Sequence, residues 1–147
     1  MPSPAQYLTV FQKGQRAILV SVGDVQHSLR DYPACRTKLA VLLEKLLVHW
    51  KKQDESFWTA LAEVFATDRP AQKIVEFLVF DLKELKVKYL AFEDRYLLAL
   101  PGGERRTFPK DGKDFLQAVL DRIQMEEEYL FPLLKRWQHM PENDVPE

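Results

Sequence analysis

Prolines cluster in this chain where its apolar periodicity stops. These breaks divide the sequence into segments and constrain the fold more than any other feature. Between the breaks, apolar residues recur every three or four positions, which is the period of a helix with one buried face. The pattern predicts an all-α chain with helices over residues 4–31, 34–66, 71–100 and 112–138. Long helices joined by short connections favour an antiparallel up-and-down four-helix bundle.

One stretch has the composition of a β-strand as well as of a helix. Residues 75–80 read Val-Glu-Phe-Leu-Val-Phe, which is rich in the residues that strands prefer. The surrounding period stays helical, however, and no second strand is predicted that could pair with this one. The interpretation as a helix is therefore retained.

Length and charge limit the kinds of protein that this chain can be. With 147 residues, of which 46% are apolar and 29% charged, residues 1–147 fit one compact domain with a single core. The 21 basic and 22 acidic residues nearly cancel. This balance produces no long-range field toward nucleic acid or an anionic membrane, so neither is expected as a partner.

Cysteine usage and the N-terminus predict a cytoplasmic protein. Cys35 is the only cysteine, which excludes an internal disulfide framework. No apolar run approaches the roughly 20 residues that a membrane span requires. Residues 1–4 lack the basic and then apolar pattern of a secretory signal.

Two similar segments lie toward the ends of the second and fourth predicted helices. In the first, His49 precedes Gln53 by four residues, and in the second, Arg122 precedes Glu126 by four residues. Each pair is followed by acidic residues and then by bulky apolar ones. Four residues make about one helical turn, so both members of a pair project from one face. Since the second and fourth helices of such a bundle run in the same direction, the two pairs are expected to meet inside it.

The segment at residues 126–132, Glu-Glu-Glu-Tyr-Leu-Phe-Pro, carries a family resemblance. Together with the helical pattern from about residue 17 to residue 137, it resembles the hemerythrin-like family of cation-binding proteins. The resemblance implies a four-helix bundle with a non-haem di-iron centre. In that family, the centre is held by histidines and carboxylates from all the helices.

Carried onto this chain, the resemblance leaves few metal ligands. His27 stands where the first-helix histidine is expected, His49 matches the second-helix histidine, and Glu126 retains a carboxylate of the fourth helix. These are the candidate metal ligands. A pair of irons needs more imidazoles and carboxylates than these, so oxygen transport in the hemerythrin manner is not expected.

The remaining ligand positions are occupied by other residue types and are predicted to line a pocket. Gln53 replaces a bridging glutamate, Leu82 replaces the third-helix histidine, and Arg122 replaces the fourth-helix histidine. Leucine cannot coordinate a metal, and arginine stays protonated and would repel a cation. Each change removes metal affinity from the implied site.

Three interpretations of the former ligand positions stay open. In the first, no cofactor binds, Arg122 pairs with Glu126, and His27, His49 and Gln53 complete a buried hydrogen-bonded network. In the second, the three candidate ligands hold a single iron or zinc ion, for which two imidazoles and a carboxylate are suitable. In the third, the matches are chance features of an ordinary helical bundle.

These interpretations lead to two functions of different classes. The favoured one is a non-catalytic regulatory or protein-binding module, monomeric or homodimeric, with a degraded di-iron site. The alternative is a metal-binding sensor or oxidoreductase that uses a mononuclear iron or zinc half-site. A weaker resemblance, at residues 122–127, to the bacterial regulators that bind the principal sigma factor (the Rsd/AlgQ family) supports a protein partner.

Other features predict no site of their own. The glycine pair at residues 102–103 follows no strand and is expected to form a turn instead of a phosphate-binding loop. Lys83, Lys86 and Lys88 are interpreted as a solvated face that could meet an acidic protein.

Overall fold

The computed structural model describes residues 2–98 and 106–141, and this part of the chain is helical with no strand. The all-α prediction is confirmed. In chain order the elements are α1 (Pro4–Gln26), α2 (Tyr32–Lys51), α3 (Glu55–Val64), α4 (Arg69–Glu93), the π-helix η1 (Asp94–Leu98), α5 (Phe108–Met125), the π-helix η2 (Glu126–Leu130) and α6 (Phe131–Gln138).

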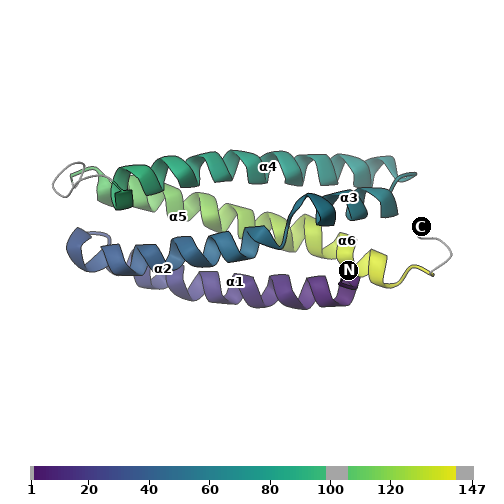
Figure 1. Ribbon diagram of the computed structural model, residues 1–147, viewed down its shortest axis with the longest axis horizontal. Coiled ribbons are helices and arrows are strands. Elements are labelled where there is room, and N and C mark those ends of the chain that lie inside the picture. The colour runs from purple at the N-terminus through teal and green to yellow at the C-terminus, as the bar shows by residue number, and fades with distance from the viewer. Residues whose placement is uncertain (1, 99–105, 142–147) are drawn as a thin grey trace.

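The long helices lie side by side and alternate in direction (Figure 1). Helix α1 packs along α2, and α4 packs along α5. Helices α5, η2 and α6 continue into one another as a single rod that runs the length of the molecule (Figure 1). Because α2 and α5 run in the same direction, residues near the end of α2 lie beside the middle of this rod.

Helix α1 is shorter than the predicted range of 4–31. Its start is as expected, since the Ser3 hydroxyl accepts from the Gln6 amide while the Gln6 side chain accepts from the Ser3 amide. It ends at Gln26. The Asp31 side chain accepts from the Ala34 amide and so caps the start of α2, which requires the chain to leave the helical conformation before it.

The predicted second helix, 34–66, is divided into α2 and α3, so a single helix was wrong there. The Asp54 side chain accepts a hydrogen bond of 2.9 Å from the Phe57 amide and starts a new helix. The indole of Trp58 donates to the Gln53 carbonyl, also at 2.9 Å. The break therefore holds Gln53 in a non-helical position with its side chain buried.

The predicted fourth helix, 112–138, begins earlier and contains a wide turn. It starts at Phe108. Pro109 is tolerated in the first turn because backbone amides there have no acceptor within the helix, so the amide hydrogen that proline lacks is not needed. At η2 the Phe131 amide donates to the Glu126 carbonyl, one residue further back than in an α-helix. Pro132 follows directly; its ring lacks a donor and collides with the preceding turn, which accounts for the irregularity.

The predicted third helix, 71–100, corresponds to α4 and η1. It begins at Arg69, with the Asp68 side chain accepting from the Ala71 amide at 3.1 Å. The described part ends at Leu98 in η1. Residues 99–100 and the glycine pair at residues 102–103 lie outside the described residues.

The core is formed by one face of every helix and changes in character along the molecule. At the end that holds the α1–α2 turn, an aromatic cluster consists of Tyr32, Phe92, Tyr96, Phe108 and Phe115, whose rings contact one another. Phe92 and Phe115 stack with ring centroids 4.5 Å apart. Buried polar side chains occur further along, near the end of α2.

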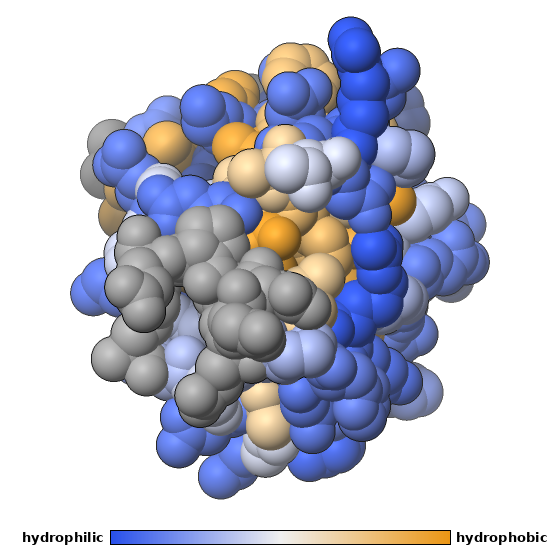
Figure 2. Space-filling view, turned by 90° about the vertical axis from the view of Figure 1, so that its right-hand side faces the viewer, coloured by the Kyte–Doolittle hydropathy of each residue, from blue (hydrophilic) through white to orange (hydrophobic). Residues whose placement is uncertain are grey.

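The end of the molecule that holds the N-terminus is mainly hydrophilic (Figure 2). Viewed from the end that holds the N-terminus, polar residues surround a small hydrophobic area (Figure 2). Among the described residues, no helix combines the length and the apolar character needed to cross a membrane.

Candidate functional site

Five polar side chains meet in the interior, and we call them the polar cluster. They are Gln15 from α1, His49 from α2, Gln53 from the break after α2, Arg122 from α5 and Glu126 from η2. None is more than 3% exposed. Buried polar groups cost free energy unless they are paired, so their contacts decide what the cluster can do.

The Glu126 carboxylate is the centre of the polar cluster. Its Oε1 atom lies 2.9 Å from His49 Nε2 and accepts from Gln15 Nε2 at 3.0 Å. Its Oε2 atom accepts from Gln53 Nε2 and from Arg122 Nε, each at 3.0 Å. Both oxygens therefore have two partners, and the carboxylate is fully hydrogen-bonded by four side chains.

Arg122 uses its remaining donors on three further groups. Its Nη1 atom donates to the Leu78 carbonyl at 2.8 Å and to the Asp81 carboxylate at 3.1 Å, and its Nη2 atom donates to Gln53 Oε1 at 3.1 Å. The guanidinium thus joins α5 to α4 and to the α2–α3 break. A permanent positive charge lies directly beside the Glu126 carboxylate.

These contacts determine the protonation of Glu126. Burial alone would raise the pKa of its carboxyl group, but the hydrogen bond and charge of His49, the charge of Arg122 and the hydrogen bond from Gln53 together lower the pKa to about 2. Glu126 is therefore ionised at neutral pH. An ionised carboxylate accepts only, so every group facing it must be a donor.

His49 has one satisfied and one unsatisfied ring nitrogen. Nε2 donates to the carboxylate, which leaves Nδ1 as the ring nitrogen without a partner. It is the one buried side-chain nitrogen or oxygen without a hydrogen-bond partner in the described part of the chain. This nitrogen faces Gly14 of α1, and a Cβ atom at that position would lie only 2.4 Å from it. Gly14 is thus required for the imidazole to reach Glu126.

A groove on the outer surface leads to this contact. It has a volume of about 540 Å³, lies between α1 and α2, and is lined by Gly14, His49, small and apolar residues, and three lysines. The small and apolar lining residues are Val10, Ala17, Val41 and Val48. The charged lining residues are Lys13, Lys45, Lys52 and Glu44.

The structure brings together His49 and Glu126 but not His27. His27 is exposed and caps the end of α1. It follows Gln15 by 12 positions, which corresponds to about 18 Å along the helix axis. Gln15 is the α1 residue that reaches the site. The expected three-ligand set of His27, His49 and Glu126 is therefore not assembled, and within residues 2–98 and 106–141 no group of three or more His, Cys, Asp or Glu residues could hold a metal ion.

The positions predicted to line the pocket behave in two ways. Gln53 and Arg122 are members of the polar cluster and contact each other. Leu82 is buried in the apolar core, one helical turn after Leu78, whose carbonyl accepts from Arg122. Asp81, beside Leu82, supplies the carboxylate at the edge of the cluster.

Gln15 and Gly14 were not predicted as site residues from the sequence, although each carried a signal. Gln15 lies four residues after Phe11 and three before Ile18, in the buried stripe of α1, where a polar residue needs a partner. Gly14 lies inside a long helix, where glycine destabilises and so indicates a packing reason.

Comparison of the chain with family models, with curated proteins and with solved structures finds no match. The resemblance to the hemerythrin-like family stays a prediction from the residues that carry it.

Proposed function

We propose that this protein is a non-catalytic, hemerythrin-like four-helix-bundle module, regulatory or protein-binding, in which the polar cluster takes the place of a di-iron centre. One observation carries the proposal. The Arg122 guanidinium donates to Glu126, Gln53 and Asp81 at once, and so supplies positive charge between helices where the family would hold a cation.

The saturation of Glu126 supports a structural role for the polar cluster. All four hydrogen bonds to the carboxylate come from the protein itself, so the carboxylate has no oxygen left for a substrate or an ion. A fully paired buried network holds its members in one arrangement. Such a network makes a rigid scaffold and gives no nucleophile or general base an open approach to a reactant.

The alternative, a sensor or oxidoreductase with one iron or zinc ion, has less support. His49 and Glu126 would need a third ligand, and their neighbours are the amides Gln15 and Gln53 and the cation Arg122. Amide carbonyls suit magnesium or calcium better than iron or zinc, and a guanidinium repels all of them.

The weaker resemblance to sigma-factor regulators does not identify a contact surface. It rests on residues 122–127, and both Arg122 and Glu126 are buried. Gln124 and Glu127 are the exposed residues of this stretch. A protein partner would have to bind these or other exposed side chains of the helices.

Metal uptake tests the proposal directly. The full chain is dialysed anaerobically against ferrous iron, or against zinc, and the bound metal is measured by elemental analysis. We expect no stoichiometric metal on the natural sequence. A double variant, Gln53→Glu with Arg122→His, restores a carboxylate and an imidazole beside His49 and Glu126, and it should bind metal and unfold at a higher temperature when metal is present.

The single variant Arg122→His is the matched control, because it removes the cation without adding the second carboxylate. It should bind metal less tightly than the double variant. Stoichiometric iron or zinc on the natural sequence would overturn the proposal.

A further inference from the structure

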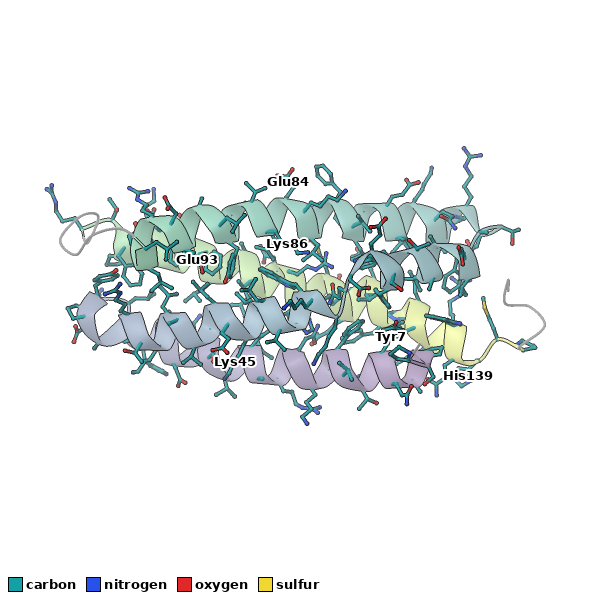
Figure 3. All side chains as sticks on the ribbon, viewed as in Figure 1. Tyr7, Lys45, Glu84, Lys86, Glu93 and His139 are labelled. Atoms are coloured by element: carbon teal, nitrogen blue, oxygen red, sulfur yellow. The ribbon has the colours of Figure 1, made fainter. Side chains whose placement is uncertain are left out.

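The outer face of α4 carries a row of large apolar side chains that no described part of the chain covers. The exposed fractions are 47% for Phe77, 61% for Phe80, 66% for Val87 and 61% for Leu90. The opposite face of the same helix holds the core residues Leu78, Leu82 and Leu85. Glu84 lies in the middle of this row, on the face of α4 that is turned away from the other helices (Figure 3).

This outer face reads the same way from both ends. Around a midpoint between Lys83 and Glu84, four pairs of residues at equal distance match, either apolar with apolar or positive with negative, whereas Glu76 falls opposite Ala91. All these side chains are exposed. The pairs are Lys83 with Glu84, Phe80 with Val87, Phe77 with Leu90, and Lys73 with Asp94.

Such a sequence is complementary to itself when two copies lie antiparallel. Residues at equal distances from the midpoint then meet across the contact, and a two-fold axis makes both halves identical. We propose that the outer face of α4 binds a second copy of this chain, with the two α4 helices antiparallel and the two-fold axis passing between Lys83 and Glu84.

Charge also selects the register and the direction of the pair. Sliding one helix by seven residues in one direction places Glu76 opposite Glu84, and sliding it in the other direction places Phe80 opposite Asp94. A parallel pair would place Glu84 opposite Glu84. Like charges in direct contact, or a phenyl ring against a carboxylate, disfavour these arrangements.

The size of the face predicts a reversible dimer. The stretch from Lys73 to Asp94 is about 30 Å long, and only one helix per chain contributes to it. A contact of this size belongs to the small, transient class of protein interfaces. The dimer should therefore dissociate on dilution. The proposal gives the protein-binding part of the proposed function a partner, but it depends on α4 alone, so failure of the dimer would leave the metal experiment unaffected.

Sedimentation equilibrium of the full chain over a concentration series tests the proposal. The mass should rise with concentration toward twice the 17.2 kDa of one chain. Glu84→Lys places a lysine opposite Lys83 in both halves of the contact, and it should weaken association by about tenfold or more. The charge swap Lys83→Glu with Glu84→Lys restores opposite charges and should restore association.

The control variant is Val20→Glu, which adds a charge at a position on α1 that is 64% exposed and lies outside the contact. It should associate as the natural sequence does, and circular dichroism should show all variants to be equally helical. A mass that stays at 17.2 kDa at every concentration, or a charge swap that fails to restore association, would overturn the proposal.

Discussion

The polar cluster and the aromatic cluster lie in the same core but are stabilised in different ways. In the aromatic cluster, many ring contacts share the stabilisation, such as Phe92 with Phe115 at 4.5 Å and Tyr32 with Phe108 at 5.0 Å. In the polar cluster, four donors serve the one carboxylate of Glu126. Dispersion and burial are spread over many atoms, whereas a buried charge depends on each of its partners. The polar cluster should therefore be more sensitive to single changes.

The largest expected effect comes from removing the buried cation. Arg122→Met leaves the Glu126 carboxylate inside the core without its counter-charge and should lower the free energy of unfolding by about 3–5 kcal/mol. Urea denaturation measures the change. The control is Arg136→Met, which removes an ion pair with Asp68 in which the arginine is 51% exposed, and which should cost less than about 1 kcal/mol. Equal losses would contradict the contrast between the two clusters.

Acid should act mainly on the polar cluster. The pKa of Glu126 is about 2 in the folded chain and 4.5 in the unfolded one. Its stabilising contribution is therefore complete above pH 4.5 and is lost as the pH falls toward 2, about 3 kcal/mol in all. Urea denaturation at a series of pH values measures this loss. Glu126→Gln should be less stable at neutral pH and should show a flatter dependence over this range; an equally steep dependence would assign the effect to other carboxylates.

Gly14→Ala should disturb the polar cluster through contact alone. The new Cβ atom would lie 2.4 Å from His49 Nδ1 and would push the imidazole away from Glu126, at a cost of about 2 kcal/mol. Gly23→Ala is the matched control in the same helix, because a Cβ atom there meets nothing within 4 Å. The control should stabilise by up to about 1 kcal/mol, since alanine favours helices. Thermal unfolding of both variants should move in opposite directions.

The smallest effect is expected in the aromatic cluster. Phe115→Leu removes one stacked ring but leaves an apolar side chain of similar reach, and it should cost about 1 kcal/mol because the neighbouring rings share the loss. Tyr129→Leu, at a position that is 43% exposed, should change stability by less than about half of that. Urea denaturation compares the two variants. A loss at Phe115 as large as that of Arg122→Met would remove the distinction between the clusters.

The sequence predicted the helices and part of the polar cluster for physical reasons. The four-residue spacing of Arg122 and Glu126 placed them one turn apart, and the Arg122–Glu126 pair is confirmed at 3.0 Å. The parallel direction of the second and fourth predicted helices brought His49 to Glu126, at 2.9 Å. These predictions rest on local geometry, which the spacing in the chain determines directly.

The contribution of α1 to the site could not be predicted in the same way. The register of α1 against the other helices depends on packing along its whole length. The match to His27 rested on family resemblance, and the structure places that residue, exposed, at the end of the helix, while Gln15 reaches Glu126. The break before Asp54 was missed because the apolar pattern continues across it on both sides.

The wide turn at η2 changes the direction in which the side chains of α6 face, relative to those of α5, although both belong to one rod. Its hydrogen bond from the Phe131 amide to the Glu126 carbonyl spans one residue more than an α-helical turn. If the same residues wound as a regular α-helix instead, all of α6 would be rotated by roughly 100° around its axis, which would take Phe131 and Leu134 out of the core. The extra residue thus lets one continuous helix aim a carboxylate at one set of neighbours and its apolar end at another.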